Sequence, residues 1–194
     1  MVAAKVRVGG AWVDTTKTAK VRVGGAWVDY APAAGGYEGL TWVPSVPASP
    51  DLNDGDAAYN MGIRFHLNAG KNCVGIRWRV PNSVAAPAGG HEIGLWTVVG
   101  ETRLAGKGFT PVPGGYQDIL FDTPVALTAG VNYTAAVYTN HYVFTAPTPT
   151  TGWSVLSPSG NVVADSAKLV VGGPGVYPAS DFNGWYYVGP LVTL

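Results

Sequence analysis

The stretch that decides the fold is residues 73–80, which read CVGIRWRV. Apolar and basic side chains alternate along it, with Val74, Ile76, Trp78 and Val80 on one side and Arg77 and Arg79 on the other. A period of two is typical of a β-strand that buries one face. The sequence therefore predicts a half-buried strand here, and Cys73, the single cysteine, is expected to act as a small buried hydrophobe.

Further short apolar runs follow the same pattern on the C-terminal side of Tyr59. They cover residues 93–99, 117–121, 131–138, 141–144, 153–156, 168–171 and 185–188. Turn residues separate them, and no sustained period of 3.6 residues lies between them, which argues against crossover helices and a parallel sheet. Residues 59–194 are therefore expected to form an all-β domain, an antiparallel jelly-roll-like β-sandwich.

The composition agrees with a chain of strands and turns. Among 194 residues there are 27 Gly and 15 Pro, and only 12% are charged. The formal net charge of zero excludes a general nucleic-acid binder, because phosphate binding needs a surplus of positive charge. No apolar run is long enough for a membrane span, and residues 1–30 lack the apolar core of a signal peptide, so neither membrane insertion nor ordinary secretion is expected.

The N-terminal segment contains an exact internal repeat. The sequence AKVRVGGAWVD occupies residues 4–14 and again residues 19–29, which is eleven identical residues at a spacing of fifteen. A short alternating run, Gly-Gly and a second short run are typical of a β-hairpin, since the glycines supply the positive φ angles of a tight turn. The sequence predicts two hairpins, in which Arg7 pairs with Trp12 and Lys5 with Asp14.

Each predicted hairpin exposes an apolar strip and a tryptophan, and an isolated two-stranded hairpin is marginal in water. We therefore expect another surface to cover both hairpins. The anchoring candidates are Val6, Arg7, Val8, Trp12, Val13, Val21, Arg22, Val23, Trp27 and Val28. Two alternatives stay open: the hairpins join the sheet of the main domain, or the duplication has no function.

The segment that follows the repeat differs in composition. Residues 31–58 are rich in Pro, Gly, Ala and Asp, which favours an extended linker. Residues 1–30 carry five basic and two acidic side chains, a net charge of +3 that the rest of the chain must balance. The predicted organisation is thus a hairpin anchor over residues 1–30, a linker over 31–58 and a sandwich over 59–194.

Signals for catalysis are weak. His66, His91 and His141 have no partner at metal-ligand spacing, and no G-x-S-x-G motif occurs. Carboxylates for glycoside hydrolysis are present but stand in turns and at strand edges: Glu92, Glu101, Asp118, Asp122 and Asp181. The run from Asp51 to Asp56 begins like a calcium loop, yet Gly62 stands where the bidentate Glu is needed. We expect no enzyme, no cofactor and no metal.

Aromatic side chains gather near polar ones in two places, which favours carbohydrate binding. One cluster lies in residues 177–187, and the other consists of Tyr138, Asn140, His141 and Tyr142. Flat rings cover the apolar face of a sugar while amides and carboxylates bind its hydroxyls. The candidate glycan-binding residues are His141, Tyr142, Asp181, Asn183, Trp185 and Tyr187. Packing is the competing interpretation, because alternate rings of the WYYV run at 185–188 should enter the core.

Several motifs resemble the DUF4082 family of β-sandwich modules. They are YNMGIRF at 59–65, VGIRW at 74–78, GLW at 94–96, LAG at 104–106, QDILF at 117–121 and TPVALTAG at 123–130, followed by Tyr133. The resemblance covers residues 57–145 and implies a jelly-roll-like, non-catalytic domain with a sugar-binding role. Tyr186 to Val188 resembles the closing strand, but Gly189 replaces the usual acidic residue there.

The repeated KVRVGGAWV element resembles the N-terminal region of tailed-bacteriophage virion proteins, often minor tail proteins. Together the two resemblances imply a virion protein, assembled in the host cytoplasm and present in many copies, that binds capsid or tail proteins through residues 1–30 and displays the sandwich at the virion surface. A capsid decoration protein and a minor tail protein are both compatible with the sequence. The alternative is a free carbohydrate-binding accessory module or hydrolase-associated domain.

Overall fold

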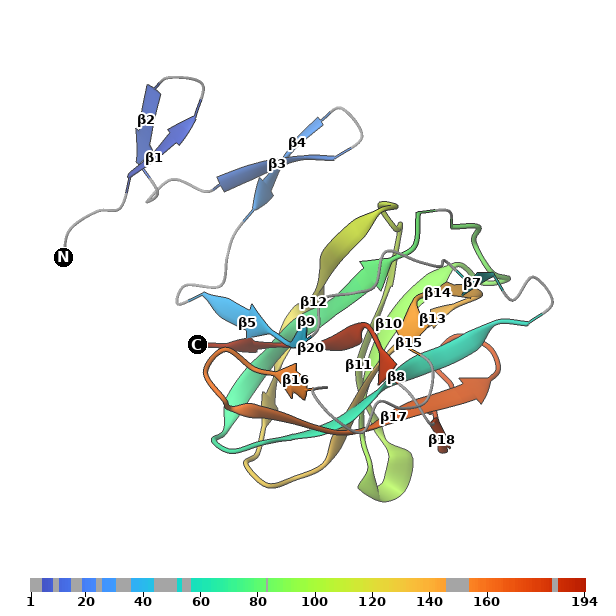
Figure 1. Ribbon diagram of the computed structural model, residues 1–194. Helices are drawn as coiled ribbons and strands as arrows, with labels where there is room; N and C mark the ends of the chain where they lie inside the picture. Colours follow the sequence, from blue (N-terminus) through green and yellow to red (C-terminus); the bar gives the residue numbers. More distant parts are fainter. Residues whose placement is uncertain are drawn as a thin grey trace. The chain divides into compact units, whose positions relative to one another are not determined.

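The computed structural model (Figure 1) describes most of the chain. The described residues are 5–8, 11–14, 19–23, 26–30, 36–43, 52–53, 57–82, 84–145, 154–182 and 185–194. The chain divides into two compact units, Met1–Tyr37 and Glu38–Leu194, and each is described by itself.

The first unit contains two β-hairpins. Strand β1 (Lys5–Val8) pairs with β2 (Ala11–Asp14), and β3 (Ala19–Val23) pairs with β4 (Ala26–Tyr30), both antiparallel. The register places Lys5 opposite Asp14 and Arg7 opposite Trp12, and the second copy repeats these pairs. The predicted hairpins and their pairing are confirmed, because a connection of only two residues leaves little freedom in register.

The second unit is built on two antiparallel sheets (Figure 1). The larger has the order β11-β10-β13-β8-β17-β18, formed by β11 (Arg103–Phe109), β10 (His91–Thr97), β13 (Tyr133–Thr139), β8 (Tyr59–Leu67), β17 (Val162–Val171) and β18 (Ser180–Phe182). The smaller has the order β12-β9-β20-β5, formed by β12 (Gly115–Leu127), β9 (Lys71–Val80), β20 (Val188–Thr193) and β5 (Tyr37–Gly39).

One hydrophobic core joins the two sheets into a sandwich. Side chains of both sheets belong to the same buried cluster, including Ile63, Phe65, Ile93, Leu95 and Val137 from the larger sheet and Ile76, Trp78, Val80, Ile119 and Val188 from the smaller. The predicted all-β antiparallel sandwich is therefore confirmed. The chain passes repeatedly between the sheets, as in the step from β8 to β9 and the step from β9 to β10.

Strand β9 shows the predicted alternation with one correction. Ile76, Trp78 and Val80 are almost completely buried, while Arg77 is only half-buried. Cys73 lies in the core cluster, which confirms that it is a buried hydrophobe, whereas Val74, although only 4% exposed, is not part of that cluster. Residues 73 and 75 pair with the adjacent residues Val192 and Leu191 of β20, so one extra residue of β9 forms a β-bulge and shifts the inward-facing set by one position.

Three pairs of short strands lie outside the two main sheets of the second unit. Strand β6 (Thr41–Val43) pairs with β16 (Ser154–Leu156), β7 (Leu52–Asn53) with β14 (His141–Tyr142), and β15 (Phe144–Thr145) with β19 (Trp185–Tyr186). Strands β5, β6 and β7 thus lie inside residues 31–58, where the sequence favoured an extended linker. The short strands there are bordered by Pro and Gly, and their pairing partners are more than 80 residues away, so composition alone did not indicate them.

Glu38 ties the edge strand β5 to the turn that precedes β17. The buried carboxylate accepts hydrogen bonds from the Ser157 hydroxyl at 2.9 Å, from the Ser159 backbone N–H at 2.8 Å and from the Ser159 hydroxyl. Burial opposes ionisation, but these hydrogen bonds and the charge of Lys71 outweigh it and lower the pKa of Glu38. Glu38 therefore stays ionised and fixes this corner of the sandwich.

A strand is present at each position predicted from residue 59 onward, although several strands are longer than predicted and β10 already ends at Thr97. The predicted runs at 141–144 and 185–188 are each divided between two strands. Strands β8, β11 and β18 have no counterpart among the predicted runs. In β11 the alternation is interrupted by Gly106, Gly108 and two basic residues, and the strand lies at a sheet edge. The regular structure outside the strands is a single 3-10 turn, η1 (Val99–Glu101), within the described ranges. In that same part of the chain, no helix is long and apolar enough to cross a membrane.

Candidate functional site

The predicted aromatic cluster exists, but its rings mainly contact one another. Tyr142 meets Tyr59 and Tyr186 edge to face, with centroid distances of 6.1 and 5.8 Å. Phe182 stacks on Tyr186 at 4.7 Å with an interplanar angle of 21°. Such contacts stabilise the end of the sandwich where β8, β14, β18 and β19 meet. The rings are therefore packed against one another, with Tyr186 buried and Tyr59, Tyr142 and Phe182 half-buried.

Two of the six candidate glycan residues are buried. Tyr187 is 1% exposed and belongs to the core cluster, and burial raises the pKa of its phenol to about 12. His141 is 5% exposed, and its backbone N–H and C=O both bond to the Thr139 hydroxyl. A buried ring cannot present a face to a sugar, so these two residues are removed from the candidate set. Strand β19 ends at Tyr186 and β20 begins at Val188, which interrupts the alternation that the sequence suggested.

The other four candidates divide into two groups. Tyr142 is half-buried within the cluster, while the Asp181 side chain is 73% exposed and bonds the Lys168 ammonium at 2.8 Å. That hydrogen bond and the charge of Lys168 lower the pKa of Asp181. Asn183 lies outside the described residues, and only the backbone pairing of Trp185 with Thr145 is described. The structure thus does not bring the six residues together into one open site.

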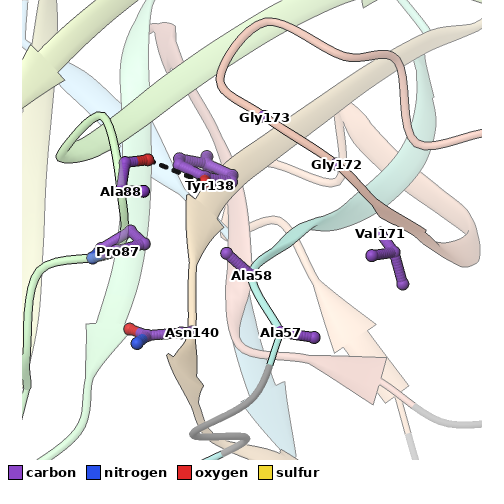
Figure 2. A pocket seen from close by; sticks show the side chains of 9 residues that line it. All are labelled: Ala57, Ala58, Pro87, Ala88, Tyr138, Asn140, Val171, Gly172 and Gly173. Carbon is purple, nitrogen blue, oxygen red and sulfur yellow. Dashed lines mark hydrogen bonds between the residues drawn. The ribbon is translucent and has the colours of Figure 1, made fainter.

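A different place on the sandwich is hollowed (Figure 2). The hollow has a volume of about 560 Å³ and lies where loops from distant parts of the chain meet. Its lining residues are Ala57, Ala58, Pro87, Ala88, Tyr138, Asn140, Val171, Gly172 and Gly173. All nine are uncharged, so the hollow suits a neutral ligand better than an ionic one.

Hydrogen bonds hold the walls of this hollow. The Tyr138 hydroxyl donates to the Ala88 carbonyl at 2.9 Å, as Figure 2 shows. The Asn60 amide donates to the Gly173 carbonyl at 2.8 Å, and the Gly172 N–H donates to the Ala58 carbonyl at 3.2 Å. These bonds connect the segments at residues 57–58, 87–88 and 171–173 to the ends of β8 and β13. The surface of the hollow is therefore formed without a ligand. Sequence reasoning identified Tyr138 and Asn140 as part of a mixed cluster but could not bring the other loops to them.

Four of the five carboxylates considered for hydrolysis have a cationic partner. Glu92 bonds Arg103 at 2.6 Å, Asp118 bonds Arg77 at 2.6 Å, and Asp122 bonds Lys107 at 2.6 Å. Together with the Asp181–Lys168 pair, these contacts place four of the five carboxylates in ion pairs, each of which joins two strands. An acid–base pair for glycoside hydrolysis needs two carboxyl groups that face one bond, and these pairings do not supply it.

The described residues also give little support for a catalytic histidine or for a metal site. His91 is buried beside Trp78 and Phe109, with ring centroids 6.0 and 5.8 Å away, and burial lowers its pKa. This environment is that of a neutral core histidine. Among the described residues no group of three or more His, Cys, Asp or Glu side chains is placed to hold a metal ion. The calcium-loop candidate at 51–56 lies outside those residues except for Leu52 and Asn53.

The hairpin anchor is described through its backbone. Val6 pairs with Val13 and Val8 with Ala11, so these four positions share one face, and Arg7 and Trp12 share the other. The positions in the second copy follow the same order, Val21 with Val28, Val23 with Ala26 and Arg22 with Trp27. All ten anchoring candidates therefore lie on paired strands of the first unit.

Comparison with known proteins gives a family but no activity. A family model described as "Domain of unknown function (DUF4082)" matches residues 44–188, well over half of the chain. The match begins after the two hairpins and covers most of the sandwich, but β5, β6 and all of β20 after Val188 lie outside it. No curated protein matches the chain.

Proposed function

The chain belongs to the DUF4082 family, and we propose that it is a structural protein of a bacteriophage particle. In this proposal the hairpin unit attaches the chain to capsid or tail proteins, and the sandwich is displayed at the virion surface. Many copies are present on each particle. The protein has no catalytic role, in keeping with the ion-paired carboxylates of the sandwich.

The observation that carries this proposal is the hairpin unit. Residues 1–37 form a compact unit of their own, and that unit contains two hairpins with matching register, each of which is a two-stranded sheet. A two-stranded hairpin of four residue pairs is too small to bury its own apolar face. It also offers unpaired main-chain groups to which a strand of another protein can add. A larger assembly is the natural partner for such a unit.

The resemblance of the repeat to phage virion proteins points to the kind of assembly. A capsid position agrees with the small size of the chain, and a tail position agrees with the minor tail proteins that carry similar elements. Residues 1–30 have a net charge of +3, which favours an acidic partner surface. The proposal includes both locations on the particle, the capsid and the tail.

A reconstruction of purified particles tests the proposal. Wild-type particles are compared with particles whose copy of this protein lacks residues 1–30. Density for the sandwich on the capsid or tail should be present in the first and absent in the second. Absence of density from the wild-type particles would refute a virion location, and density that survives the truncation would refute attachment through the hairpins.

A second candidate function is carbohydrate binding by the sandwich, and the uncharged hollow favours it. Its size suits one or two sugar residues, and its walls combine small apolar side chains with backbone polar groups. This function can accompany the virion role, or it can be the sole role of a free accessory module. We place the ligand in this hollow, beside the half-buried Asn140, because His141 and Tyr187 are buried. Tyr138 is buried as well and belongs to the wall through its bond to Ala88.

Two tryptophan variants of the full chain test this candidate. Ala88→Trp places a large ring at the wall of the hollow, whereas Ala86→Trp places the same ring two residues away, at an exposed position outside the lining. Binding to an array of neutral glycans should be lost in Ala88→Trp and kept in Ala86→Trp. Equal binding by both variants, or no binding by the wild type, would refute a sugar site in the hollow.

A further inference from the structure

The two hairpins are equivalent in structure as well as in sequence. Each pairs Val with Val, Arg with Trp and Lys with Asp at matching positions of the repeat. The second hairpin adds only the pair Ala19 and Tyr30 at its open end. Two segments that are identical in sequence and pairing present the same donors, acceptors and apolar positions, so they recognise the same kind of surface.

A partner with a single docking site would leave one hairpin uncovered. Each copy carries an apolar set at Val6, Val8 and Val13, or at Val21, Val23 and Val28. Each also carries a tryptophan on its other face, Trp12 or Trp27, and the hairpin can bury neither the valines nor the tryptophan alone. A partner that covers both copies therefore presents two equivalent surfaces. A symmetric assembly or a chain with repeated motifs provides them, because its subunits present the same patch at regular intervals.

We propose that the two hairpins dock simultaneously on two equivalent sites of one repetitive protein assembly. The inference rests on the proposed function for the identity of that assembly, the virion, and adds the number and spacing of the sites. Each copy carries one Lys, one Arg and one Asp in its paired strands, and Lys17 lies between the copies. The equivalent sites are therefore apolar with an acidic border.

Covalent geometry limits the distance between the two sites. Five Cα–Cα steps join Asp14 to Ala19 and can span at most about 18 Å. A strand of four residues adds about 10 Å along its own length. The centres of the two docked hairpins therefore lie within about 30 Å of each other. Sites so close belong to neighbouring subunits or to neighbouring repeats of one subunit.

Double attachment has a large expected effect on binding. Once the first hairpin has docked, the second meets its site at an effective concentration in the millimolar range for a short spacer. Two weak contacts then act as one strong contact, and loss of either should weaken binding by about 10² to 10⁴-fold. Because the hairpins are equivalent, both losses should be of similar size.

The test uses particles produced without this protein, to which the purified full chain is added back. Sedimentation measures the dissociation constant and the number of chains bound at saturation. Trp12→Ala and Trp27→Ala should each weaken binding by about 10² to 10⁴-fold. At saturation each single variant should reach about twice the wild-type number of chains per particle, because each variant chain occupies one site instead of two. Val99→Ala, at a position 88% exposed in the sandwich, is the control and should bind like the wild type.

The outcomes separate the two proposals. If the wild type does not bind the particles, the proposed function fails and this inference fails with it. If the wild type binds but one tryptophan variant binds equally well, only one hairpin docks and double attachment is refuted. If both variants bind weakly but saturate at the wild-type number of chains per particle, the hairpins cover each other or act as one unit. This result also refutes double attachment. A spacer of about 20 Gly and Ser residues inserted after Asp14 gives a second check, since it should weaken binding much less than either substitution.

Discussion

Glu38→Gln is the substitution from which we expect the clearest effect on the sandwich. The Glu38 carboxylate accepts three hydrogen bonds from Ser157 and Ser159, and its exposed fraction is only 7%. A glutamine keeps the size and can still bond the backbone N–H, but it loses the charge that strengthens all three bonds. A hydrogen bond to a charged group contributes about 1.5–3 kcal/mol and a neutral one about 0.5–1.5 kcal/mol. We therefore expect a loss of about 2 kcal/mol, since the contributions are not additive.

For a domain of this size, such a loss corresponds to a fall in Tm of roughly 4–8 °C at pH 7, measured by calorimetry. The pKa of Glu38 is lowered on folding from its ordinary value of 4.5, so the folded state favours the ionised form. That stabilisation is complete above the unfolded pKa and is lost as the pH falls through the folded pKa. The difference in stability between wild type and Glu38→Gln should therefore be full at pH 7 and shrink below about pH 4.5.

Asp122→Asn is the matched control, because it neutralises a carboxylate whose side chain is 85% exposed. An exposed ion pair contributes little, so the Tm of this variant should stay near that of the wild type. A Tm of Glu38→Gln equal to that of the wild type at pH 7 would refute the role of the carboxylate. A difference that stays constant down to pH 3 would show that the effect does not arise from its ionisation.

Two further predictions concern the interior of the sandwich. Gly62→Ala should destabilise it by about 3 kcal/mol in urea denaturation, because the added Cβ would lie 2.0 Å from the Ala135 carbonyl oxygen and 2.6 Å from the Ala136 Cβ. Gly173→Ala, where a Cβ meets nothing within 4 Å, should be neutral, and an equally stable Gly62→Ala variant would contradict the packing of β8 against β13. The Cys73 thiol, fully buried and with its pKa raised to about 12 by burial, should not react with a thiol reagent at pH 8 until urea unfolds the chain. Rapid reaction of the native protein would contradict its burial.

Much of the sandwich could be predicted because its strands have a local signature. In β9 the alternation of Ile76, Trp78 and Val80 with Arg77 and Arg79 indicates which face is buried. The bulge at Val74 has no sequence pattern of its own, since it depends on how β20 pairs with β9 and not on the residues of β9 alone. Strands β5, β6 and β7 were missed for the same reason: their short sequences become strands only through partners far along the chain.

The candidate site was predicted less well than the fold. Tyr138, Asn140, His141 and Tyr142 are adjacent in sequence, and their composition indicated a site. The sequence could not show that His141 turns inward while Asn140 lines a hollow. That distinction depends on loops at 57–58, 87–88 and 171–173, which approach Tyr138 only in the folded chain. Composition thus located one wall of the hollow, and tertiary contacts supplied the others.

The hairpins, unlike the hollow, could be predicted from the local sequence alone. Their pairing is entirely local, so a repeat of eleven residues fixes both the fold and the register of each copy. Because nothing in a hairpin of four residue pairs requires a second copy for its own pairing, the reason for duplication has to lie outside the hairpin. A partner that repeats its surface supplies that reason, since two linked copies gain affinity from a second equivalent site without any new kind of contact. The number of chains bound per particle by a one-hairpin variant is therefore the quantity that decides whether the repeat is functional.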